Sequence, residues 1–237
     1  MNVAIIAPDT GLLLAVGYGK DIDPKAATAL AALEVARKSG VRVILLDSVR
    51  EELDGKLNEI AEVIPALQSA IRDVPNLDAP ADLDAIEGIM VRAKAASPER
   101  VARYLDAIEA ESVRACNANP NTPIREIIGG ITGAAVTLLE VVRARIDGLR
   151  LELWKPKPDS AAVDGPLISG VTGYDFDHVR SSEALGRAED TQVCFIVFEA
   201  KLHSRQQEVT RGYPHVVVTN PNYLPRYLTG GNTEDAR

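Results

Sequence analysis

The first fifty residues constrain the fold more than any other part of the chain. The apolar run NVAIIA (2–7) predicts a buried strand. The next segment, DPKAATALAALEVARKSG (23–40), predicts a helix, because Pro24 suits the first helical position and Gly40 suits the end. VRVILLD (41–47) predicts a second strand. A strand–helix–strand connection of this length makes the two strands parallel neighbours, so we expect an α/β fold.

The rest of the chain predicts a small parallel sheet flanked by helices, with a long helical insertion. Helical patterning runs from about residue 51 to 148 and is broken at loops such as NANPNTP (117–123). LRLELW (149–154) and HVVVT (215–219) predict further strands. Val193–Phe198 has strong β propensity but is flanked by capping and helix-forming residues, and we interpret it as a buried helix opened by Asp190.

Composition excludes some classes of function. The formal charge of −8 opposes a general polyanion-binding surface, although a local basic groove or a metal ion can still meet phosphate. Only two cysteines occur, without metal-type spacing, which fits a reducing cytosol. The N-terminus lacks the pattern of a signal peptide, and the longest apolar stretch, IIGGITGAAVTLL (127–139), is too short to span a bilayer. We therefore expect a soluble cytoplasmic protein.

Acidic and amide side chains follow the predicted strands. Asp9 comes directly after the first strand, Glu51 and Glu52 follow the second, Asn220 follows HVVVT, and Asp190 precedes the predicted late helix. In a parallel sheet, ligands bind beyond the carboxyl ends of the strands. Carboxylates gathered there repel one another unless a cation lies among them, and oxygen ligands without His or Cys suit Mg²⁺ or Mn²⁺.

Four segments together resemble the PIN domain family: IIAPDTGLLLAV, VILLDSVREEL, AEDTQVCFIVFEAK and HVVVTNPNYL. Members of that family are mostly Mg²⁺- or Mn²⁺-dependent ribonucleases, and many are toxins of toxin–antitoxin pairs. The resemblance implies that Asp9, Glu52 and Asp190 are metal ligands, that Thr219 and Asn220 complete the site, and that the reaction is hydrolysis of RNA phosphodiester bonds. Because Glu52 directly precedes a leucine, as in the family pattern, it is preferred over its neighbour as the ligand.

The resemblance also implies a domain organisation and partners. We expect a single PIN-like domain over 1–228, with its core at about 2–60 and 185–228, a helical insertion at about 61–148, and a disordered tail at 229–237. RNA is the expected partner. An antitoxin or another protein, or a second copy of the chain, is a further candidate partner, and no membrane is expected.

Other interpretations of the same residues stay open. Pro221 and Asn222 stand where the family often has a closing carboxylate, so the chain could be a catalytically silent PIN-like module that binds a partner protein. Asp175 or Asp177, in GYDFDH, could supply the missing ligand, although a solvated loop is the simpler interpretation.

The glycine-rich segment Gly129–Gly133 could serve a Rossmann-type nucleotide-binding enzyme, but it lacks a complete fingerprint, and close helix packing explains it more simply. Each predicted ligand also has a structural alternative, as a helix cap, a first-turn acid or a turn residue. His178, His203 and His215 show no ligand spacing, so we expect surface or strand-end roles for them.

Overall fold

A computed structural model describes residues 3–156 and 165–228 of the chain, which forms two compact units. The α/β unit comprises Met1–Leu53 and Val142–Arg237, and the helical unit comprises Asp54–Val141. The sequence-based prediction placed the core of the PIN-like domain at about 2–60 and 185–228. It therefore left out residues 149–184, which belong to the α/β unit. A single PIN-like domain stays a prediction, and the predicted disordered tail lies outside the described residues.

Five parallel strands form one sheet in the α/β unit, in the order β3-β2-β1-β4-β5. Their bounds are β1 Val3–Pro8, β2 Arg42–Leu46, β3 Glu152–Trp154, β4 Gln192–Ile196 and β5 Val216–Thr219. Pro8 pairs with Ile196, and Ile196 pairs with Thr219, so three strands end at the same level. The predicted α/β class with a small parallel sheet is confirmed, and the carboxyl edge of this sheet is where a site is expected.

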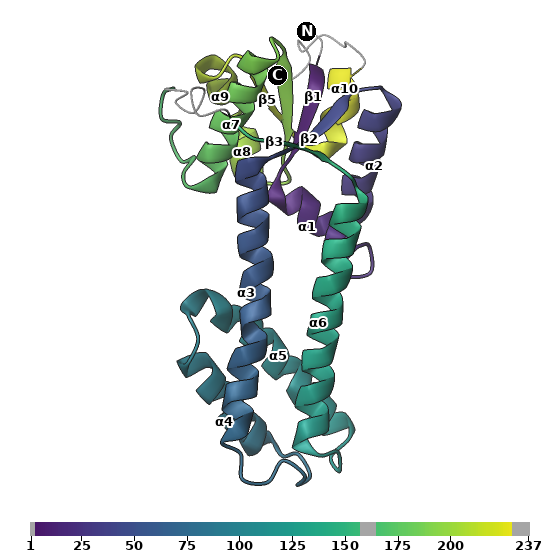
Figure 1. Ribbon diagram of the computed structural model, residues 1–237, viewed down its shortest axis with the longest axis vertical. Coiled ribbons are helices and arrows are strands. Elements are labelled where there is room, and N and C mark those ends of the chain that lie inside the picture. Colours follow the sequence, from purple (N-terminus) through teal and green to yellow (C-terminus); the bar gives the residue numbers. More distant parts are fainter. Residues whose placement is uncertain (1–2, 157–164, 229–237) are drawn as a thin grey trace. The chain divides into compact units, whose positions relative to one another are not determined.

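Helices cover both faces of the sheet. In Figure 1, α7 lies on one side of the strands, and α2 and α10 lie on the other. The helices and the 3-10 turn of this unit are α1 Thr10–Tyr18, α2 Ala26–Lys38, α7 Tyr174–Ala188, α8 Ala200–Ser204, α9 Gln206–Gly212, η2 Pro221–Tyr223 and α10 Leu224–Leu228. Because both faces are covered, β4 and β5 carry continuous runs of buried residues rather than an alternation of buried and exposed ones.

The predicted helix over Val193–Phe198 is wrong. Residues Gln192–Ile196 form β4, which pairs with β1 on one side and β5 on the other. Four consecutive side chains of this strand, from Val193 to Ile196, are fully buried, which a central strand of a covered parallel sheet requires. The capping and helix-forming residues beside it belong to the turn after α7 and to α8, so their signal came from neighbouring elements.

The helical unit has its own apolar core. It is built from the later part of α3 (Asp47–Arg72), from α4 (Leu83–Ala95) and α5 (Glu99–Ala118), and from the first part of α6 (Ile124–Gly148). The fully buried core side chains come from all four helices and include Leu67, Ile86, Ile89, Met90, Val101, Leu105 and Ile128. The predicted loop at 117–123 lies between α5 and α6, although α5 continues to Ala118.

Among the described residues, one helix is long and apolar enough to cross a membrane by length and composition. It is α6, and only 22% of its most apolar window is buried. Its first half nevertheless contributes Ile124, Ile127 and Ile128 to the core of the helical unit. A core helix of a soluble protein passes the same test, so α6 alone does not indicate a membrane protein.

Candidate metal centre

Asp9 lies at the centre of the carboxyl edge of the sheet. It follows β1, and its backbone N–H donates to the carbonyl of Ile196 at 3.0 Å, which ties it to the end of β4. Its side chain caps α1 by accepting from the N–H of Gly11 at 3.2 Å. The predicted capping role is therefore present. It leaves the carboxylate partly buried at the strand ends, where a ligand for a cation is expected.

Glu52 reaches the same point from the second turn of α3. Its side chain is 19% exposed, whereas Glu51 is exposed to solvent. One oxygen, Oε2, accepts from Thr10 Oγ1 at 2.7 Å and lies 2.9 Å from Nε2 of His178. Successive helical residues point about 100° apart, so only one of the two glutamates can face the strand ends. That residue is Glu52, as the sequence predicted.

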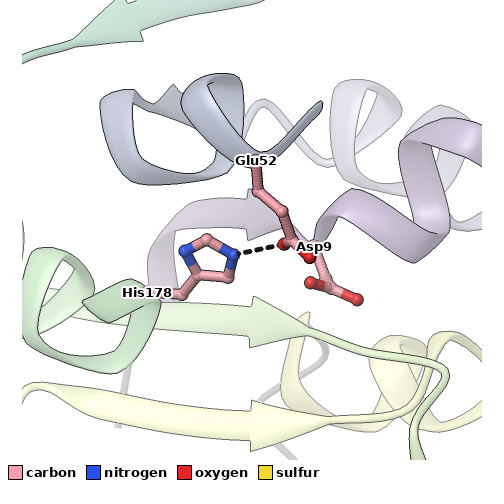
Figure 2. Close-up of side chains that lie close together, drawn as sticks. All are labelled: Asp9, Glu52 and His178. Carbon is pink, nitrogen blue, oxygen red and sulfur yellow. Dashed lines mark hydrogen bonds and ion pairs between the residues drawn. The ribbon is translucent and has the colours of Figure 1, made fainter. Parts of the chain in front are cut away.

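His178 completes a three-residue cluster, contrary to the surface role expected for it. It is fully buried on α7, with Nδ1 3.0 Å from Ser48 Oγ and its ring edge-on to Phe195. One ligand atom from each of Asp9, Glu52 and His178 lies within 4.8 Å of the other two. Figure 2 shows these three side chains converging from the turn between β1 and α1, from α3 and from α7, with the contact between His178 and Glu52 dashed. Such spacing allows all three to surround one ion.

Two further carboxylates lie near this cluster. Asp175 is in the first turn of α7, one turn before His178, so both lie on the same face of the helix. Burial raises the pKa of Asp175, as do the nearby carboxylates of Glu199 and Glu52, while His178 lowers it. Glu199 follows β4 and begins α8 at the carboxyl edge. Asp9, Glu52, Asp175 and Glu199, together with His178, are called the acidic site below.

The environment of Asp9 disfavours its ionised form. Burial, and to a smaller extent the carboxylate of Glu52, raises the pKa of Asp9 to about 6. His178 and the backbone N–H groups of Gly11 and Thr10 act in the opposite direction and do not compensate. A divalent cation would reverse this imbalance by favouring the ionised form of every carboxylate around it.

An open cleft of about 300 Å³ lies beside Asp9. It is lined by Asp9, Gly11, Leu14, Tyr18, Asp23, Lys25, Phe198 and Glu199. Two members of the acidic site, Asp9 and Glu199, therefore face a space large enough for part of a substrate. All of these lining residues belong to the α/β unit.

The structure does not bring Asp190 to this site. Asp190 lies in the turn between α7 and β4, with a positive φ of 49°, at the amino edge of the sheet. Since a strand rises roughly 3.3 Å per residue, Asp190 is about 20 Å from Asp9, which is level with the end of β4. Its predicted role as a third ligand is corrected on this ground. The error follows from the misassigned helix, which reversed the direction of the segment.

Asn220 lies at the carboxyl edge, directly after β5. Its side chain accepts from the N–H of Asn222 at 3.0 Å and caps η2, which is the predicted turn-forming alternative. Because β4 lies between β1 and β5, Asn220 is two strands from Asp9, roughly 10 Å away. Thr219 before it is fully buried. A role for Thr219 and Asn220 in the site stays a prediction.

Two short signals could have identified the residues that sequence reasoning ranked too low. Asp175 and His178 stand three apart in YDFDH, and this spacing places both on one face if the segment is a helix rather than the predicted loop. Glu199 directly follows the apolar run ending at Phe198, the position of an acid past a buried strand. Both signals depend on assigning α7 and β4 correctly.

The glycine-rich segment does not resemble a nucleotide-binding turn. Gly129, Gly130 and Gly133 lie inside α6, which no strand directly precedes, whereas the dinucleotide fingerprint joins a strand to a helix. A Cβ atom added at any of them would meet nothing within 4 Å, so the predicted close helix packing is also wrong.

Comparison of the chain with family models, curated proteins and solved structures finds no match.

Proposed function

We propose that the protein is a Mg²⁺- or Mn²⁺-dependent endoribonuclease with a PIN-like active site. The observation that carries this proposal is the acidic site, in which carboxylates from β1, α3, α7 and the end of β4 gather at the carboxyl edge of a parallel sheet. The open cleft beside Asp9 and Glu199 gives a substrate access to them. The resemblance of the strand-end segments to the PIN domain supports RNA as the substrate.

The residues present fit a hard divalent ion. Carboxylate oxygens are its preferred ligands, and the pKa of Asp9 is raised to about 6 chiefly by burial, so a bound cation would favour its ionised form. Asp9 and Glu52 would hold the ion, with Asp175 and Glu199 near enough to share its charge. An ion at this position would lower the pKa of a bound water and would neutralise the charge of the phosphodiester.

The protein itself contributes position and orientation. Thr10 and His178 both contact Oε2 of Glu52, and Ser48 contacts the other ring nitrogen of His178, so the rotamer of Glu52 is held from two sides. Holding a ligand in place before the substrate binds lowers the cost of reaching the transition state. His178, Thr10 and Ser48 are therefore positioning residues in this proposal.

Cleavage of a labelled RNA tests the proposal. Wild-type protein with Mn²⁺ or Mg²⁺ is expected to cleave, and chelation by EDTA is expected to stop cleavage. Glu52→Gln should lower the rate at least about a hundredfold, or about 2.7 kcal/mol in the barrier, because it removes a ligand. Glu51→Gln is the matched control, since Glu51 is the exposed neighbour on the same helix, and its rate should stay within a few-fold. Cleavage that persists in EDTA, or equal losses in both variants, would contradict the assignment.

The second candidate is a catalytically silent PIN-like module that binds a protein such as an antitoxin. The separate core of the helical unit favours it, because a unit of this kind could serve a partner without the acidic site. Inertness towards RNA in Mn²⁺, together with stable co-purification of a partner that requires residues 54–141, would support this alternative over the nuclease.

A further inference from the structure

Two pairs of an aromatic ring and a cation lie near the carboxyl edge of the sheet. The ammonium group of Lys25 lies 5.4 Å from the ring centroid of Phe198, the residue directly before Glu199. The guanidinium carbon of Arg226 lies 5.2 Å from the ring centroid of Tyr223. His203 also stacks on Tyr223, with ring centroids 5.9 Å apart and an interplanar angle of 16°.

One pair lies on the rim of the acidic site, and the other lies on elements next to it. Phe198 and Lys25 line the cleft together with Asp9 and Glu199. The backbone N–H of His203 donates to the carbonyl of Glu199 at 3.2 Å, which places the ring that stacks on Tyr223 one helical turn from Glu199. The turn η2, which ends at Tyr223, packs against α2, and Lys25 precedes the first residue of α2. The two aromatic rings therefore lie on neighbouring elements at one edge of the sheet.

The chemistry of these pairs matches an unpaired nucleic-acid strand. Proteins that bind single strands combine aromatic side chains, on which bases stack, with cations that meet the phosphates. Aromatic residues make up only 4% of the chain, so few are available for the core. Tyr223 is nevertheless left 45% exposed at the surface. Because the whole protein carries a charge of −8, attraction of phosphate by these two cations is local. Bases within a duplex already stack on one another, so they cannot use such rings.

We propose that Phe198 and Tyr223 stack on two unpaired bases of an RNA strand and that Lys25 and Arg226 meet its phosphates, so that the strand passes the acidic site. This inference rests on the proposed function, because the bound strand is the proposed substrate of the nuclease. Binding of the strand can be measured without cleavage. The two pairs are called the strand-binding rim below.

Fluorescence anisotropy in EDTA tests the rim with a labelled single-stranded RNA and with the same sequence in a duplex. The single strand is expected to bind at least about tenfold more tightly than the duplex. Phe198→Leu and Tyr223→Leu keep apolar bulk but remove the flat ring, and each should weaken single-strand binding about tenfold, as loss of one base stack does. Equal affinity for the duplex, or wild-type affinity in both leucine variants, would overturn the proposal.

Two lysines at opposite ends of α2, Lys25 just before it and Lys38 at its last residue, test the electrostatic part. Lys25→Ala should weaken binding and reduce the slope of log affinity against log salt by about 0.7, the contribution of one phosphate contact on a single strand. Lys38→Ala, at the other end of the same helix, where its side chain is 81% exposed, should change neither quantity. Equal effects of the two variants would indicate nonspecific attraction and overturn the assignment of Lys25.

The rim and the nuclease can fail separately. A protein that binds single strands through the rim but never cleaves them would overturn the nuclease alone. A protein that cleaves RNA while both leucine variants bind normally would overturn the rim alone. Melting temperatures of all variants, measured first, establish that each is folded.

Discussion

Asp9 occupies a position where an ionised carboxylate is unfavourable in the absence of a cation. Its pKa is raised to about 6, chiefly by burial and then by Glu52, so the folded protein binds a proton there more tightly than the unfolded chain, whose ordinary value is 3.8. Ionisation of Asp9 therefore destabilises the fold. The free energy of unfolding should fall as the pH rises from about 4 to about 6, by up to about 3 kcal/mol, and stay low above that range. A bound cation would remove this loss.

We expect millimolar Mn²⁺ or Mg²⁺ to raise the melting temperature at neutral pH, because the ion binds only the folded cluster. The rise should disappear well below pH 6, where a proton on Asp9 competes with the ion. Asp9→Asn should stabilise the metal-free protein at neutral pH and abolish the metal-induced rise. Thermal melts of both proteins with and without metal, across this pH range, measure all three effects. A melting temperature that metal does not change at neutral pH would contradict a preformed site.

At the scale of elements, α7 carries two members of the acidic site and is itself fixed by a buried ion-pair cluster. Glu183 on α7 is fully buried and accepts from the backbone N–H of His215 at 2.9 Å and from Arg187 at 2.8 Å. A second contact joins it to Nδ1 of His215 at 3.0 Å. Because His215 directly precedes β5, these bonds tie α7 to the sheet. Although burial raises it, the pKa of Glu183 is lowered overall by its bonds to His215 and Arg187.

The lowered pKa gives a stability contribution with a defined sign. Glu183 stabilises the fold at pH values above its ordinary pKa of 4.5, and that contribution is lost as the pH falls below 4.5. Glu183→Gln should lower the free energy of unfolding by about 2–4 kcal/mol near neutral pH, because the amide puts a donor against buried donors. Urea denaturation measures the loss. Glu189→Gln, which changes a surface ion pair with Arg42, should cost less than about 1 kcal/mol, and equal costs would contradict the structural role of Glu183.

The direction of a single element decided how much of the site was predictable from sequence. Asp9 was identified because it directly follows the apolar run of β1, and Glu52 because it lies in the helix after β2 and precedes a leucine, as in the family that the chain resembles. Val193–Ile196 is equally apolar, but a short buried run does not distinguish strand from helix. Assigning it as a helix put Asp190 at the wrong edge and hid Glu199. His178 was missed because its burial depends on packing against Phe195, which no local pattern encodes.

At the scale of the whole molecule, the acidic site and the strand-binding rim use residues of the α/β unit alone. The helical unit, Asp54–Val141, contributes a separate core to which four helices supply fully buried side chains. Contacts within this unit are mostly between helices close in sequence, such as α4 and α5. Segments whose contacts are local in sequence fold quickly, and these contacts do not require the distant sheet.

We therefore expect a fragment of residues 54–141 to fold without the α/β unit. It should be helical by circular dichroism and should melt in a single cooperative transition, because its apolar core is supplied from within these residues. Leu105→Ala, which empties a fully buried position on α5, should lower the free energy of unfolding by about 2–5 kcal/mol. Val91→Ala, at an apolar residue of α4 that is 58% exposed, should change it by less than about 0.5 kcal/mol. A fragment that melts without cooperativity, or that responds equally to both substitutions, would show that its core forms only within the complete chain.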